Sequence, residues 1–179
     1  MNAVPGYILN FCQPAVPPLG PFGSEAVNLR GFGLAPLPVS TNKKPRILFK
    51  HLKRKHSIPY VERLAVRHAD ANVAIILDLC NPPLTVVDVD DPALINAMLD
   101  RFGPTPLQVN TPSGGRHLYY KHDNEKQNNR LEDMKVDIKA GRGYVIVPPS
   151  FTRIGAYDFE SGSWSDVKTL PCIKAGALP

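Results

Sequence analysis

Residues 84–92, LTVVDVDDP, set a strand-like apolar run against three closely spaced aspartates. The run indicates a buried strand, and Asp88, Asp90 and Asp91 follow it directly. Residues two apart on a strand point to one face, so Asp88 and Asp90 project together. Their repulsion is relieved most simply by a hard divalent cation, which takes oxygen ligands. The alternative is a surface strand end with solvated acids.

A glycine-containing motif, TPSGGRHLYY, occupies residues 111–120. Its two glycines allow a backbone to approach a ligand closely, and exposed amides can hold phosphate oxygens. Arg116 can bind a phosphate with two parallel hydrogen bonds, and His117 can donate or accept a proton beside it. A plain hairpin also favours SGG, so a structural interpretation stays open.

A third motif, VDIKAGRGYVIVPPS, occupies residues 136–150 and places Asp137 inside an apolar strand. A charge in such a position is seldom left unpaired. Asp137 is therefore a candidate third carboxylate of a metal site, and Lys139 shares its face of the strand. Pairing of Asp137 with Lys139 or Arg116 is the structural alternative.

Basic residues concentrate between positions 43 and 67, where only Glu62 opposes them, in a chain of 179 residues with net charge +5. Such a cluster favours contact with nucleic-acid phosphates, although a solvated basic face is the simpler explanation. The cluster comprises Lys43, Lys44, Arg46, Lys50, Lys53, Arg54, Lys55, Arg63 and Arg67.

Periodicity and turn residues predict an α+β (α/β) chain with an antiparallel sheet and helices on one face. The expected helices are 46–56, 57–70 and 91–103. The expected strands are 31–39, 72–79, 84–90 and 156–161, with hairpins at 107–122 and 136–150. Prolines predict an extended arm over 1–27, a domain follows over 28–162, and 163–179 is expected to be a loop-like tail.

Other features argue against export and membrane insertion. No apolar run approaches the ~18 residues of a membrane span, and no signal-peptide pattern begins the chain. The three cysteines are far apart and lack zinc-binding spacing, which favours a reducing, cytoplasmic location.

Taken in order, VVDVDD, SGGRHLYY and VDIKAGRGYVIVPPS resemble the bifunctional DNA primase/polymerase (prim-pol) domain of the archaeo-eukaryotic primase superfamily. The resemblance covers about residues 28 to 161. It implies a two-lobed catalytic domain with an RRM-like antiparallel sheet, flanking helices and a nucleotide cleft between the lobes. One departure is the proline-rich arm, which stands where the family has a helix before its first strand.

The resemblance implies that Asp88, Asp90 and Asp137 hold two divalent ions, Mg²⁺ or Mn²⁺, and that His117 joins them in catalysis. The implied nucleotide-binding residues are Ser113, Gly114, Arg116, His117, Lys139, Lys44 and Ser150. The basic segment supplies the candidate nucleic-acid contacts, which are Lys50, Lys53, Arg54 and Lys55.

The implied activity is primer synthesis or extension on a single-stranded DNA template from NTP or dNTP substrates, in replication of a plasmid, phage or mobile element. A separate or fused helicase is an expected partner. The alternative is a non-catalytic module that binds single strands on an RRM-like sheet, with Tyr119, Tyr120 and Tyr144 for base stacking. A tyrosine-dependent nicking enzyme is disfavoured, because the chain has no His-x-His pair.

Overall fold

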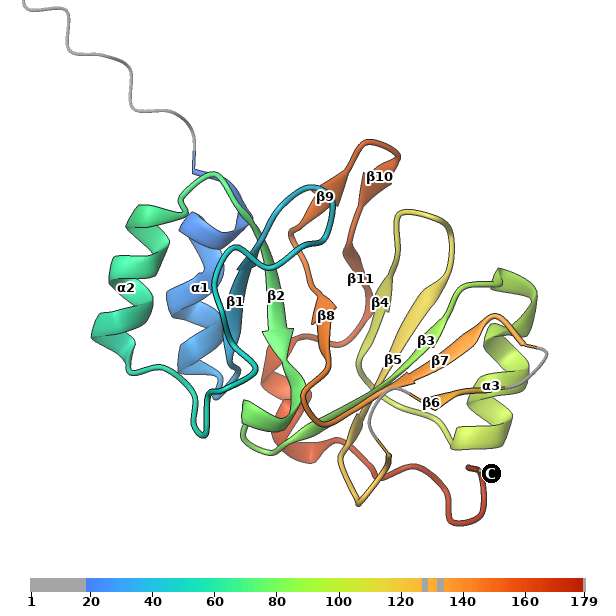
Figure 1. The fold of residues 1–179 in the computed structure, drawn as a ribbon. Coiled ribbons are helices and arrows are strands. Elements are labelled where there is room, and N and C mark those ends of the chain that lie inside the picture. Colours follow the sequence, from blue (N-terminus) through green and yellow to red (C-terminus); the bar gives the residue numbers. More distant parts are fainter. Residues whose placement is uncertain (1–18, 127–128, 132–133, 179) are drawn as a thin grey trace, which may run out of the picture.

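The computed structural model describes residues 19–126, 129–131 and 134–178. They form two main antiparallel sheets that lie side by side, each flanked by helices, and a third sheet of only two short strands (Figure 1). The strand order is β1-β2-β8 in the smaller sheet and β11-β4-β5-β3-β7-β6 in the larger sheet. The expected α+β class with antiparallel sheets is confirmed.

The first lobe contains α1 (Pro21–Gly31), β1 (Pro36–Val39), α2 (Ile58–Arg67), β2 (Asn72–Ile76) and β8 (Tyr144–Ile146). The second lobe contains β3 (Leu84–Val89), α3 (Ile95–Phe102), β4 (Gln108–Asn110), β5 (Arg116–Lys121), β6 (Asn129–Arg130), β7 (Val136–Lys139) and β11 (Asp158–Ser161). Shorter elements are the hairpin of β9 (Phe151–Thr152) and β10 (Gly155–Ala156) and the 3₁₀ turns η1 (Leu77–Leu79), η2 (Pro92–Leu94) and η3 (Trp164–Thr169).

Helix α1 corrects the prediction of an extended arm over residues 1–27. The helix begins at Pro21, and a proline is tolerated in a first turn because its missing N–H would have no intrahelical partner there. Phe22, Ala26 and Leu29 lie on one face and are fully buried. The helix that the resemblance required before the first strand is therefore present. The rest of the predicted arm lies outside the described residues.

Residues 46–56, termed the basic strap, do not form the predicted helix. Two of the strap's carbonyls bind arginines from other elements. The Arg142 guanidinium donates to the oxygen of Leu52, and Arg30 Nε donates to the oxygen of His56 over 2.7 Å. Because these carbonyls are bound from outside, the segment runs irregularly over the first lobe and keeps its basic side chains at the surface.

The prediction that residues 136–150 form one hairpin is also wrong, because β7 lies in the larger sheet and β8 in the smaller one. The GRG turn carries the chain from one lobe to the other beside the crossing that leads from β2 to β3. Backbone hydrogen bonds of 3.0 Å, from Leu77 to Gly143 and from Asp78 to Gly141, join the two crossings. These two hydrogen bonds hold the crossing segments together where the chain passes between the lobes.

The segment after residue 162 packs on the domain and is not the predicted loop-like tail. Ser163 caps η3, and Trp164, Val167 and Leu170 are buried in the larger hydrophobic core. The helices predicted over 57–70 and 91–103 are confirmed as α2 and, after η2, α3. Within the described part of the chain, no helix has the length and apolar character to cross a bilayer.

Candidate functional site

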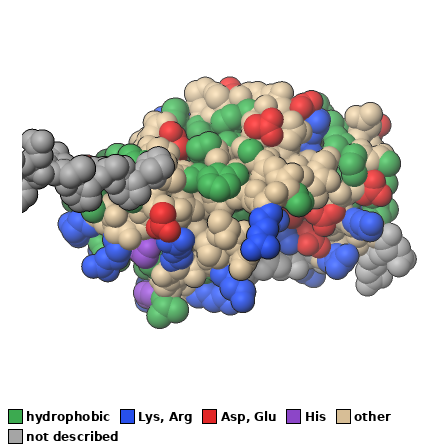
Figure 2. Space-filling view, turned by 90° about the horizontal axis from the view of Figure 1, so that it is seen from above, with side chains coloured by type: hydrophobic (Ala, Val, Ile, Leu, Met, Phe, Trp, Pro, Cys, Tyr) green, Lys and Arg blue, Asp and Glu red, His purple; other side chains and the backbone are tan. Residues whose placement is uncertain are grey.

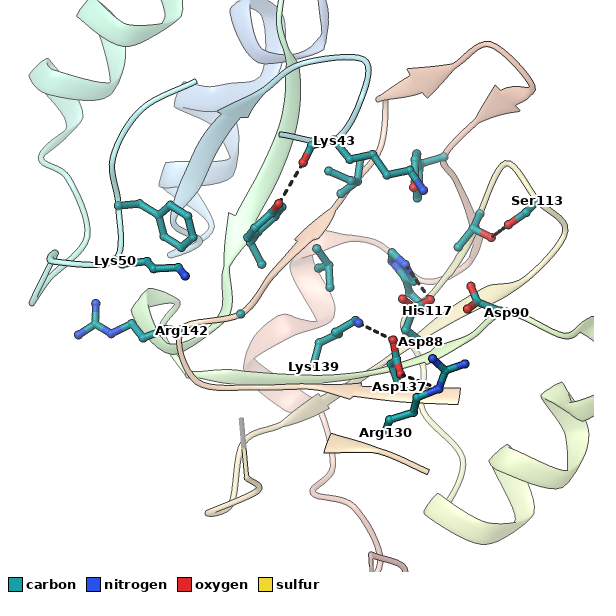
Figure 3. A pocket seen from close by; sticks show the side chains of 17 residues that line it. Lys43, Lys50, Asp88, Asp90, Ser113, His117, Arg130, Asp137, Lys139 and Arg142 are labelled. Carbon is teal, nitrogen blue, oxygen red and sulfur yellow. Dashed lines mark hydrogen bonds and ion pairs between the residues drawn. The ribbon is translucent and has the colours of Figure 1, made fainter. Parts of the chain in front are cut away.

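Three polar side chains form a row across the larger sheet. Asp88 on β3 is paired with Asp137 on β7 and, on its other side, with His117 on β5. The neighbours Val87 and Val89 pack with α3 on the opposite face. Strand alternation therefore directs the three polar side chains away from α3, toward the space between the lobes (Figure 3).

An open cleft of about 610 Å³ lies over this row, which is within the size range of small-ligand sites. Its charged lining comprises Asp88, Asp90, Asp137, Lys43, Lys50, Arg130, Lys139 and Arg142. Lys50 and Arg142 lie at one end of the cleft and the acids toward the other (Figure 3). From above, basic side chains gather along one edge of the molecule, with a group of acids among them near its right-hand end (Figure 2).

His117 is the buried member of the row and lies against Asp88, with 3.4 Å between Nε2 and the carboxylate. Burial opposes ionisation of Asp88, but His117, Lys139 and Lys43 outweigh it and hold the pKa below its usual value. Asp88 is therefore ionised at neutral pH. The buried Nδ1 of His117 has no hydrogen-bond partner among the described residues.

The pKa of Asp90 responds to its burial and to the neighbouring carboxylates. Its partial burial and its repulsion by Asp88 and Asp137 raise its pKa above the usual value. Charge on Asp90 therefore opposes folding, unless a cation enters the cleft.

We expect Asp90→Asn to stabilise the chain at neutral pH when divalent ions are absent. A raised folded-state pKa means that ionised Asp90 destabilises the fold above that pKa, and that the effect vanishes at lower pH. Relief of about 0.5 kcal/mol would raise Tm by about 1–2 °C. Calorimetry from pH 7 downward should show the difference closing with acid, and a constant difference would contradict the electrostatic cause.

Asp137 carries an internal counter-ion. Lys139 Nζ lies 2.6 Å from one of its carboxylate oxygens, and Arg130 Nε lies 3.9 Å from the other. The pair with Lys139 is the alternative foreseen from the sequence. Arg130 was not foreseen, because it reaches the cleft only through the pairing of β6 with β7, which sets it opposite Asp137.

Asp88, Asp90 and Asp137 supply oxygen atoms of the kind that a divalent cation takes as ligands. Three carboxylates border one space, and the raised pKa of Asp90 reports their mutual repulsion. In the described ranges, however, no group of three or more His, Cys, Asp or Glu side chains is placed closely enough to hold a metal ion.

Of the two adjacent lysines in the turn after β1, Lys43 lines the cleft, whereas the sequence had suggested Lys44. Lys43 adopts a left-handed backbone conformation, with φ of 62°, in the turn after β1. This directs it toward the cleft, where its Nζ lies 5.7 Å from the ring centroid of Tyr157. Burial lowers the pKa of Lys43, but Tyr157 and the nearby carboxylates outweigh it and raise the pKa overall. Lys44 is exposed and does not line the cleft.

The predicted hairpin of residues 107–122 is confirmed as β4 and β5. In the loop that joins them, Ser113 lines the cleft together with Thr111, and their hydroxyl oxygens are 3.2 Å apart. Gly114 supplies the turn, with φ of 87°, but does not line the cleft.

Arg116 does not reach the predicted phosphate position. It precedes His117 on β5 and so lies on the other face of the sheet. There it donates to Gln108 over 3.1 Å and forms an ion pair of 3.0 Å with Glu160. Arg116 thus ties β5 to β4 and β11.

Two further candidates hold the protein's own backbone. The buried hydroxyl of Ser150 accepts from Val73 N and donates to Val73 O, each over 2.9 Å. Lys55 Nζ donates to Gly33 O over 3.3 Å, at the edge of the first lobe. Neither lines the cleft.

The strap's other candidates remain at the surface. Lys53 and Arg54 are exposed and lie outside the cleft lining, whereas Lys50 forms part of that lining. These side chains are therefore available to phosphates beside the cleft or at its end.

The alternative of a stacking module loses its main residues. Tyr119 and Tyr120 are both fully buried, at 0% exposure, so neither offers a face to a base. Tyr144 lines the cleft, but it packs edge-on against Phe49 and its hydroxyl donates to the oxygen of Lys43. Among the described residues, the larger sheet therefore presents two carboxylates and an imidazole toward the cleft and no row of aromatic rings.

Comparison with known proteins places the chain in one family. The model of the family described as "Bifunctional DNA primase/polymerase, N-terminal" matches residues 25–172. The match begins within α1 and ends after η3, so it takes in residues 25–27 of the segment that the sequence had assigned to an arm and residues 163–172 of the one assigned to a tail. No curated protein matches the chain.

Proposed function

We propose that this chain, which belongs to the bifunctional DNA primase/polymerase family, makes or extends primers on single-stranded DNA with divalent ions held by Asp88, Asp90 and Asp137. The row of Asp137, Asp88 and His117 is the observation that carries the proposal. It aligns two carboxylates and a buried imidazole over a cleft that also contains cations.

Nucleotidyl transfer joins a primer 3′-hydroxyl to the α-phosphate of a nucleotide and releases pyrophosphate. A pair of divalent ions supplies Lewis-acid stabilisation of the attacking and leaving oxygens. Lys43 would neutralise the triphosphate, and His117, which lines the cleft, would lie beside it. Lys139, which is paired with Asp137 in the structure, would turn to the phosphate oxygens if Asp137 held an ion.

The basic strap is proposed to bind nucleic-acid phosphates through Lys50, Lys53 and Arg54. Lys55 is left out of this set, because it is bound to the first lobe. Binding through these side chains would weaken as salt rises. The proposed substrates include both NTP and dNTP. The resemblance also suggests replication of a plasmid, phage or mobile element, with a helicase as partner.

The deciding experiment measures nucleotide incorporation on single-stranded DNA, with and without a primer, in Mg²⁺, Mn²⁺ or EDTA. Incorporation without a primer would establish priming, and incorporation only with a primer would establish extension. EDTA should abolish both activities.

Asp137→Ala should reduce incorporation by about 100-fold or more, because it removes one oxygen ligand and leaves Lys139 without its partner. Asp100→Ala is a suitable comparison, since it removes an exposed acid on α3 outside the cleft. Wild-type protein that binds single strands but incorporates nothing under any of these conditions would refute the catalytic proposal.

A further inference from the structure

A second groove, of about 380 Å³, adjoins the cleft and shares Lys43 and Ser113 with it. Three loops form its walls: the turn after β1, the β4–β5 loop and the β9–β10 hairpin, which lie near one another at the top of Figure 1. Its remaining lining comprises Thr41, Asn42, Pro112, Thr152, Arg153 and Ile154. The mechanism proposed above leaves this groove without a role.

The groove's chemistry is that of an anion site. Lys43 and Arg153 are cations, the other polar side chains are neutral hydroxyls and an amide, and no acid lines it. This contrasts with the cleft, where three carboxylates compete with the cations. An extended anion therefore meets uniformly favourable groups once it passes Lys43.

Arg153 is the residue most clearly free to bind. It lies exposed at the tip of the β9–β10 hairpin, and among the described residues it forms no ion pair. Ile154 beside it is 73% exposed, so the tip of the hairpin also offers an apolar surface. A guanidinium next to an apolar surface suits a phosphate with its attached sugar and base.

The two ends of the cleft indicate where a bound strand would enter and leave it. Lys50 and Arg142 lie at one end and Ser113 at the other (Figure 3). A strand that passes over the acids needs a phosphate path at each end. The basic strap provides one, and the groove is positioned to provide the other.

We propose that this groove binds the backbone of single-stranded nucleic acid where it leaves the cleft, with Arg153 on a phosphate and Asn42 beside it. The path past the acids rests on the proposed function. The attraction of the groove for a polyanion is independent of the proposed function, because it follows from the groove's own side chains.

The test measures binding of a fluorescein-labelled oligothymidylate by anisotropy between low and moderate salt. Arg153→Ala should weaken binding roughly three- to tenfold and reduce the slope of log K against log salt by about 0.7, the value for one phosphate of a single strand. Lys168→Ala removes an exposed cation on η3, outside the groove, and should change neither quantity.

Activity separates the groove from the catalytic proposal. In Arg153→Ala, KM for the template should rise while incorporation at saturating template is unchanged. If the wild type incorporates no nucleotide but Arg153→Ala still weakens oligonucleotide binding, the groove stands and the catalytic proposal fails. If Arg153→Ala binds like Lys168→Ala, or raises only the KM for the nucleotide, the strand assignment is overturned.

Discussion

Asp88→Asn is expected to reduce nucleotide incorporation by at least ~1,000-fold while leaving the chain folded. Asp88 is the central member of the row, adjacent to both Asp137 and His117. Loss of its charge removes several kcal/mol of stabilisation from a metal-assisted transfer, and each 1.36 kcal/mol is a factor of ten in rate. Single-turnover incorporation at saturating nucleotide and primer measures the effect on the chemical step.

Asn is chosen because it keeps the shape of Asp. His117, Lys139 and Lys43 hold the pKa of Asp88 below its usual value. The charge on Asp88 therefore stabilises the fold at any pH above the usual carboxyl pKa, and this stabilisation is lost as the pH falls. Asp88→Asn forfeits that contribution but relieves the repulsion on Asp90. We therefore expect Tm to change by only a few degrees at neutral pH.

Asp100→Asn is the matched control, because Asp100 is an exposed acid on α3, on the far side of the larger sheet. It should incorporate nucleotide at the wild-type rate. An Asp88→Asn variant that retained a tenth or more of the wild-type rate, with an unchanged circular dichroism spectrum, would exclude Asp88 as an ion ligand.

Strand alternation made the acids predictable. Residues 84–90 read as one strand, so the shared direction of Asp88 and Asp90 followed from the two-residue period. The same rule, applied to β5, would have separated Arg116 from His117. The prediction for Arg116 was wrong because it followed the chemical suitability of the motif and overlooked that adjacent strand residues face opposite ways.

Tertiary pairing was not predictable in the same way. A short GRG turn between two strand-like runs predicts a hairpin, yet β7 and β8 join different sheets. What decides this is the pairing of the turn with Leu77 and Asp78 from another crossing. Lys43 itself has a left-handed backbone conformation in the turn that brings it to the cleft. The sequence of two adjacent lysines in a loop does not indicate which of them adopts it.

Proline composition misled the prediction at the N-terminus. Several prolines before residue 22 indicated an arm, but Pro21 occupies the one helical turn where proline is favoured. The apolar spacing of Phe22, Ala26 and Leu29 was the available signal, and it outweighs composition once burial is considered. Prolines therefore needed to be judged by position within an element.

Gly115→Ala is expected to be the most destabilising small substitution near the site. A Cβ at this position would lie 2.3 Å from the backbone oxygen of Val89 and 3.1 Å from the Cα of Asp90. Both neighbours are backbone atoms, so neither can rotate away as a side chain could. Separation of β5 from β3 would cost about 3 kcal/mol and lower Tm by about 6–12 °C.

The substitution also displaces the site, because Gly115 joins the Ser113 loop to His117 at the point where β5 meets the end of β3. Gly31→Ala is the comparison, since a Cβ at that end of α1 meets nothing within 4 Å and alanine favours a helix by about 0.5–1 kcal/mol. Thermal unfolding of both variants should therefore show shifts of opposite sign. Equal Tm values for Gly115→Ala and the wild type would mean that the loop does not pack against β3 as closely as described.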